Sequence, residues 1–147
     1  MLFRSLIAIF QVCVYLYAQA VLQNAASETG RLFLTGQVQG NNWDQTTVKN
    51  KACASMGSMF NCTALILSVQ TYQDFASANA SAPALYDNNG NAITTWPFNY
   101  GTQGQIMVVQ LVYPWSVVSG PLGFSIGNLP NKAAEMMGVA AFRVEPY

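Results

Sequence analysis

The sequence predicts an α+β fold in which one long N-terminal helix packs on a small antiparallel β-sheet. Residues 1–36 follow a helical pattern, and no charge, Pro or Gly occurs from Ser5 to Ser27. Residues 37–147 contain three short apolar or alternating stretches bounded by Gly, Pro and Asn, a pattern typical of strands joined by turns. About 110 of the 147 residues lie outside the helix, which suits one domain with one core.

The first two-thirds of the N-terminal helix is long and apolar enough to cross a membrane. A run of roughly 20 uncharged residues, rising about 1.5 Å each, matches the roughly 30 Å of a bilayer core. Gln11, Gln19, Gln23 and Asn24 interrupt this run, and an amide in hydrocarbon without a partner costs a few kcal/mol. Two interpretations remain open: a single-pass anchor, or a subunit stored in a membrane and later packed helix against helix.

The last third of the helix is amphipathic. Its inner stripe comprises Val21, Leu22, Ala25, Ala26, Thr29, Leu32 and Phe33. Because these residues recur at three- and four-residue spacing, we expect this part of the helix to lie on the globular domain. Thr35 and Gly36 provide a stop signal, and Arg31 favours the negative end of the helix dipole.

A short helix and three strands are expected in the globular part. Asn41 or Asn42 can cap the helix, which runs to about Met56 with Asp44 in its first turn. The strands are expected at residues 63–72, 105–113 and 138–145. Pro114 is expected to end the second strand because it cannot donate a ladder hydrogen bond.

Two further features are expected between and within these strands. A short helix is predicted near residues 132–137, just before the third strand. In the third strand, Phe142 and Val144 should face one side, with Arg143 and Glu145 on the other.

Composition argues against an enzyme and against a nucleic-acid-binding protein. The chain has six basic residues, six acidic residues and no histidine, so it lacks the commonest general base and any basic patch for phosphate. The carboxylates are scattered, and no nucleophile or phosphate-binding motif is present. Asp87, Asn89 and Asn91 alternate as in a calcium loop, but the Gly is misplaced and no acidic residue closes the loop, which favours a turn. We expect no cofactor and no metal.

The three cysteines fall into two groups. Cys13 lies in the apolar helix, where a thiol behaves as a small hydrophobe. Cys53 and Cys62 bracket a turn-rich segment in the domain that the membrane helix would export, and outside the cytoplasm such a pair should be oxidised. The alternative is two unpaired buried thiols. A disulfide closing about ten residues would contribute about 2.5 to 3 kcal/mol in the loop-entropy model.

Several separated motifs resemble one known family. The motifs are residues 17–39 (YAQAVLQNAASETGRLFLTGQVQ), the Cys53 and Cys62 pair before a Leu-rich strand, and the endings Tyr113-Pro-Trp115 and Phe142-Arg-Val-Glu-Pro-Tyr147. Together they resemble the TadE-like proteins of tight-adherence pili. The resemblance covers nearly the whole chain. It implies a pilin-like protein made with a leader, held in the cytoplasmic membrane of a bacterium and passed to a pilus assembly machine.

The chain departs from that family at its start. The family usually carries a Glu-Phe dipeptide and often a Pro there, and neither precedes Leu2-Phe3-Arg4. Two interpretations follow: a processed product, or a divergent member that retains Met1. Arg4 stands where many pilins place an acidic residue, and a buried Arg needs a carboxylate, a carbonyl or a water-filled lumen.

From these features we expect a structural subunit of an extracellular pilus-like filament, or fimbrium. Residues 1–36 would form the assembly helix and residues 37–147 the sheet domain with the Cys53–Cys62 disulfide. Expected partners are further copies of the chain, the assembly machinery, the cytoplasmic membrane and bound lipid. The residues expected to matter in assembly are Arg4, Phe10, Gln11, Cys13, Tyr17, Ala18, Gln19, Ala20 and Glu28.

Two alternatives remain. One is a minor component at the filament tip or in assembly priming. The other, of a different class, is a membrane-anchored carbohydrate-binding module that uses Trp43, Trp96, Tyr100 and Trp115.

Overall fold

The computed structural model describes residues 2–78, 84–88, 91–116, 127, 129 and 132–145, without the side chains of Leu2 and Arg4. Over these residues the chain has the predicted α+β fold. The helices are α1 (Leu2–Leu34), α2 (Gln37–Gly40) and α3 (Gln45–Met56). The strands are β1 (Ile66–Tyr72), β2 (Ile106–Trp115) and β3 (Ala134–Arg143).

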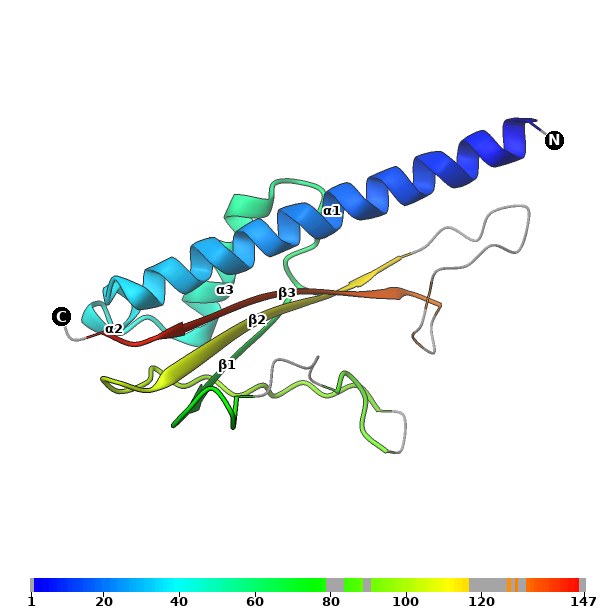
Figure 1. Cartoon of the computed structure of the whole chain (residues 1–147). Helices are drawn as coiled ribbons and strands as arrows, with labels where there is room; N and C mark the ends of the chain where they lie inside the picture. The colour runs from blue at the N-terminus through cyan, green and yellow to red at the C-terminus, as the bar shows by residue number, and fades with distance from the viewer. Residues whose placement is uncertain are drawn as a thin grey trace.

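The three strands form one antiparallel sheet with β2 in the centre. The first eight residues of β2 are all buried, which confirms the prediction of a central strand that is apolar on both faces. Helix α1 lies along one face of the sheet, over β3 and β2, and α3 lies beside α1 (Figure 1). The ends of β2 and β3 that carry Trp115 and Ala134 point toward the N-terminal end of α1 (Figure 1).

The amphipathic third of α1 buries the predicted stripe on this sheet. Leu22, Ala25, Ala26, Thr29 and Phe33 are all buried, and Val21 and Leu32 are partly buried. The helix approaches β3 so closely that only a glycine fits at position 138. A Cβ atom there would lie 2.6 Å from the carbonyl oxygen of Leu22 and 3.0 Å from the Cβ of Ala26.

The start of α3 differs from the prediction. Asn41 is the C-cap of α2, which spans residues 37–40, and Asn42 has a positive φ of 49°. Neither asparagine therefore caps α3. The cap is Asp44 instead, whose side chain accepts a 2.9 Å hydrogen bond from the main-chain N–H of Thr47. Helix α1 ends at Leu34, and Gly36 follows with a positive φ of 70°, as the predicted stop at Thr35 and Gly36 requires.

Two expectations about the later strands were wrong. Residues 134–137 are strand rather than helix, because they pair with residues 112–115 of β2, and this pairing overrides their helical propensity. Strand β2 continues through Pro114 to Trp115 rather than ending before the proline. The pairing of β2 with β1 ends at Val112, so Pro114 lies where β2 pairs with β3.

The alternation of buried and exposed side chains at the end of β3 and in the two residues after it agrees with the sequence. Val144 is buried and Phe142 partly buried, whereas Arg143 and Glu145 are exposed. The predicted motif residues Pro146 and Tyr147 lie outside the described part of the chain.

Candidate functional site: the exposed apolar half of helix α1

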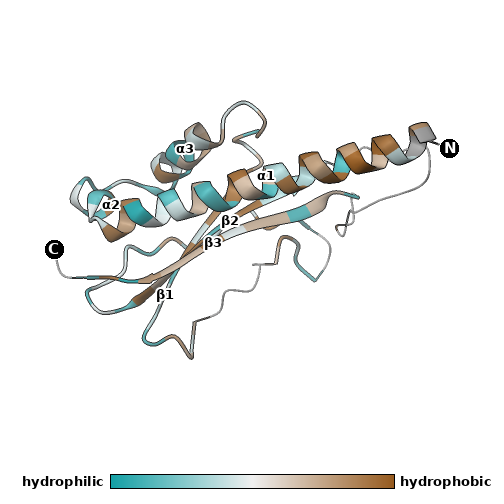
Figure 2. Cartoon of the chain, turned by 45° about the horizontal axis from the view of Figure 1, so that its top comes forward, coloured by the Kyte–Doolittle hydropathy of each residue, from teal (hydrophilic) through white to brown (hydrophobic). Residues whose placement is uncertain are grey.

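The N-terminal half of α1 presents large apolar side chains outward. Phe3 and Phe10 are 77% and 70% exposed. The other exposed apolar side chains on this half are Leu6, Ile9, Val12, Leu16 and Tyr17. Figure 2 shows this half of the helix as the more hydrophobic one. The segment Ser5–Leu34 is long and apolar enough to cross a membrane, and only 11% of its most apolar window is buried within the chain.

The outward face of α1 changes character after Ala20. From Val21 to Leu32 the exposed side chains are polar or charged: Gln23, Asn24, Ser27, Glu28 and Arg31. Leu34, at the end of the helix, is again exposed and apolar. The opposite side of this same stretch is buried on the sheet. The helix therefore has two parts, an apolar part with its outer surface uncovered and a part that docks on its own domain and faces water.

Most of the predicted assembly residues lie on the outer surface of α1. Phe10, Cys13, Tyr17, Ala20 and Glu28 are exposed. These residues are available to a membrane or to another subunit. Gln11 is partly buried, and the side chain of Arg4 lies outside the described part of the structure.

Ala18 and Gln19 have a different role from the one we expected. Ala18 is fully buried within its own chain, so it is not available for packing between subunits. The side-chain amide of Gln19 donates a 2.7 Å hydrogen bond to the main-chain carbonyl of Met137. Because both residues contact the domain of their own chain, substitutions there would disturb the folded subunit itself.

Gln23 makes the most complete contact between α1 and the edge of the sheet. Its amide group donates to the carbonyl of Val139 at 2.8 Å and accepts from the N–H of Val139 at 3.1 Å. Together with Gln19, it occupies main-chain groups along the outer edge of β3. An exposed strand edge is a template for unwanted pairing, and these amides cover part of it. The sequence placed both amides in the apolar run but could not reveal that their partner is a strand more than 100 residues away.

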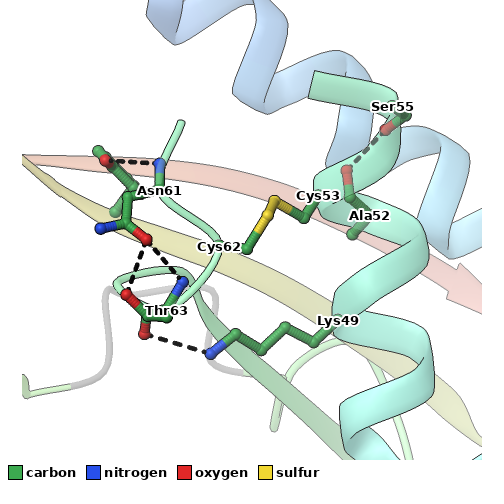
Figure 3. Close-up of a disulfide and its surroundings, with 8 residues drawn as sticks. Lys49, Ala52, Cys53, Ser55, Asn61, Cys62 and Thr63 are labelled. Atoms are coloured by element: carbon green, nitrogen blue, oxygen red, sulfur yellow. Dashed lines mark hydrogen bonds between the residues drawn. A yellow bond between two sulfur atoms is a disulfide. The ribbon is translucent and has the colours of Figure 1, made fainter. Parts of the chain in front are cut away.

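The predicted disulfide is present between Cys53 and Cys62, with the Cα atoms 5.7 Å apart. It joins α3 to the segment before β1 (Figure 3). Beside it, the side chain of Asn61 accepts hydrogen bonds from the N–H and hydroxyl of Thr63 at 3.0 and 2.7 Å. The ammonium of Lys49 donates to the carbonyl of Thr63 at 3.4 Å (Figure 3). Cys13 is a free, exposed thiol.

The aromatic residues proposed for a carbohydrate site belong to different clusters. The hydroxyl of Tyr100 donates to the carbonyl of Trp43 at 3.0 Å, and Lys51 lies 4.3 Å from the centre of the Trp43 ring. Trp115 instead packs against Phe60, with ring centres 5.8 Å apart.

Trp96 lies at a third place. It lines a cavity of about 440 Å³ together with residues of α3 and β1. The four rings therefore do not form one binding surface.

The described residues hold few perturbed charges. Hydrogen bonds from the side chain and N–H of Thr47 lower the pKa of Asp44, and those from Ser77 do the same for Asp74. Burial raises the pKa of Glu135 in β3.

Asp87 forms a turn. Its carboxylate accepts from the N–H of Asn91 at 2.8 Å, whereas Asn89 lies outside the described residues. In the part of the chain that the structure describes, no three His, Cys, Asp or Glu side chains gather in a way that could hold a metal.

No family model, curated protein or solved structure matches this chain.

Proposed function

We propose that the chain is a structural subunit of an extracellular bacterial pilus-like filament. In this filament the N-terminal helices of many copies bundle into a core, and the sheet domains face outward. The observation that carries the proposal is the uncovered apolar surface of α1 from Phe3 to Ala20. The domain packs its own core without this surface, which therefore needs a partner of another kind.

The size of the uncovered surface supports this proposal. Fully burying one large apolar side chain is worth about 1.5 to 3 kcal/mol. Seven such side chains are exposed in the N-terminal half of α1: Phe3, Leu6, Ile9, Phe10, Val12, Leu16 and Tyr17. A lipid bilayer or a bundle of identical helices would cover them, and a subunit that moves from one to the other would use both.

Charge and redox state are consistent with the same proposal. The formal net charge is zero, and a protein without net charge has little colloidal repulsion to oppose association. The disulfide between Cys53 and Cys62 fits a domain outside the cytoplasm. Before assembly, α1 would anchor the subunit in the cytoplasmic membrane, where bound lipid and the assembly machinery would meet it.

A pair of arginine substitutions on the outward face of α1 tests the proposal. Ala20 and Asn24 are both exposed and lie four residues apart, Ala20 on the apolar part and Asn24 on the polar part. We expect Ala20→Arg to abolish filaments in negative-stain electron microscopy, because burying an unpaired guanidinium in a bundle costs several kcal/mol. Asn24→Arg should leave filaments intact.

A second variant separates assembly from membrane insertion. Ala20→Phe stays apolar, so it should enter the membrane fraction as wild type does, yet it enlarges the same surface and should still weaken filaments. Wild-type filaments from both Ala20 variants would contradict the proposed function.

A further inference from the structure

We propose that Asn61 is a glycosylation site and carries a sugar on its side-chain nitrogen. Asn61, Cys62 and Thr63 form an Asn-x-Thr sequence, the acceptor motif for sugars linked to asparagine. The site lies in the sheet domain rather than on α1, so this inference goes beyond the proposed filament function and does not depend on it.

The acceptor segment lies on the surface of the domain. Asn61, Cys62 and Thr63 are all exposed, and they belong to the connection between α3 and β1. Two anchors hold this connection: the disulfide from Cys62 to Cys53, and a 3.1 Å hydrogen bond from the main-chain N–H of Asn61 to the hydroxyl of Tyr113. A sugar on Asn61 would therefore stand at a fixed place on the surface.

The two ends of the Asn61 amide have different surroundings. The oxygen accepts hydrogen bonds from the main-chain N–H and the hydroxyl of Thr63, at 3.0 and 2.7 Å. A main-chain N–H can only donate, so the amide atom that faces it must be the oxygen, and this fixes the orientation of the amide. The nitrogen makes no hydrogen bond to any residue that the structure describes. Figure 3 shows it pointing away from Thr63 and from the disulfide.

The sugar would be joined through this nitrogen. The donor is a sugar whose anomeric carbon carries a diphosphate leaving group, and a glycosyltransferase of the cell catalyses the transfer. A bond forms between Nδ2 of Asn61 and the anomeric carbon, and the bond from that carbon to the diphosphate oxygen breaks. The diphosphate leaves with the electron pair, and Nδ2 loses one proton. Both hydrogen bonds from Thr63 go to the amide oxygen, so the folded segment accommodates the sugar without losing either.

A sugar here would supply polar cover in which the sequence is poor. Charged residues make up only 8% of the chain and the net charge is zero, so there is little colloidal repulsion between domains. Close to the acceptor, the side chain of Met59 is 43% exposed. Because sugars linked to asparagine are bulky and solubilising, one at Asn61 would hydrate this part of the surface.

The sequence contains one further motif of this kind, at Asn79, Ala80 and Ser81. These residues lie outside the described part of the chain, so the structure assigns Asn61 alone. A test must therefore locate the sugar as well as detect it.

Peptide mass spectrometry of the full-length protein, purified from cells that naturally produce it, tests the assignment. After reduction and alkylation, the peptide that contains Asn61 should exceed its sequence mass by at least one sugar residue, and fragmentation should place the sugar on Asn61. A peptide found entirely at its sequence mass would overturn the inference. A sugar found only on Asn79 would overturn it as well.

Matched variants separate the acceptor nitrogen from the fold. Asn61→Asp keeps an oxygen that accepts from Thr63 but lacks the nitrogen, so it should lose the sugar. Thr63→Ser keeps the hydroxyl of the motif and should keep the sugar, whereas Thr63→Val removes the hydroxyl and should lose it. The mass of the unreduced protein shows whether Cys53 and Cys62 are still joined in each variant. A sugar that persists at position 61 in Asn61→Asp would contradict the linkage.

Electron microscopy of the same preparations keeps this inference apart from the proposed function. Filaments built from unglycosylated protein would overturn the inference and leave the proposed function standing. Protein that carries the sugar on Asn61 but forms no filaments would support the inference and count against the proposed function.

Discussion

Replacing Gly138 by alanine should push α1 slightly away from the sheet and destabilise the fold. The added Cβ would lie 2.6 Å from the carbonyl oxygen of Leu22 and 3.0 Å from the Cβ of Ala26. Both neighbours are rigid, because one is helix backbone and the other is attached directly to it. The helix must therefore move outward by several tenths of an ångström along the whole interface, and gaps of about 0.5 to 1 Å already forfeit a quarter to a half of a dispersion contact.

The expected loss of stability follows from this overpacking. Extra atoms in a well-packed core cost about 1 to 3 kcal/mol. For a chain of this size that corresponds to a fall in Tm of about 3 to 10 °C. Gly138→Val should cost more, because its two methyl groups meet the same helix backbone.

Thermal unfolding in detergent, followed by near-ultraviolet circular dichroism, measures this loss. Gly40→Ala is the matched control, since among the described atoms nothing lies within 4 Å of a Cβ at that position, and its Tm should match or slightly exceed that of wild type. Adding Ala26→Gly to Gly138→Ala should recover part of the loss in a double-mutant cycle. A Gly138→Ala protein as stable as wild type would refute the close approach of α1 to β3.

Three further predictions concern other contacts. Replacing Cys53 and Cys62 by serine should lower the free energy of unfolding by about 2.6 kcal/mol in the loop-entropy model, given their separation of nine residues; denaturant titration that finds no loss would refute this. Gln23→Leu removes both hydrogen bonds to Val139, so it should cost about 1 kcal/mol and speed hydrogen exchange at the Val139 amide; unchanged exchange would contradict the contact. The pKa of Asp44 is lowered in the fold from its usual 3.8, so its contribution is present above about pH 4 and is lost as pH falls through the lower folded value. Asp44→Ala should therefore reduce the acid dependence of Tm, and an unaltered dependence would count against the cap.

The arrangement of α1 on an antiparallel sheet could be predicted because it depends on periodicity. The three- and four-residue spacing from Val21 to Phe33 identified the buried stripe, and the alternation near Phe142 identified the two faces of β3. The helix predicted at residues 132–137 was wrong because residues with helical propensity there pair with β2 instead. Local sequence does not reveal that partner.

The candidate site could be predicted only in outline. Apolar residues surround the first two-thirds of α1, so periodicity does not tell which side faces the domain. Ala18 therefore looked equivalent to Ala20, although one is buried and the other exposed. The roles of Gln19 and Gln23 depend on the edge of β3, a long-range feature that sequence spacing does not encode.

The most direct test of the central claim is cryo-electron microscopy of filaments sheared from cells that produce this chain. We expect the α1 helices to be bundled in the filament core, with Phe10, Tyr17 and Ala20 at contacts between subunits. Arg4 should meet a polar partner such as Glu28 of a subunit displaced along the axis, because its own Glu28 is 24 residues away, about 36 Å along one helix. Filaments in which the outward face of α1 touches no neighbouring chain, or cells that make no filament containing this chain, would contradict the account.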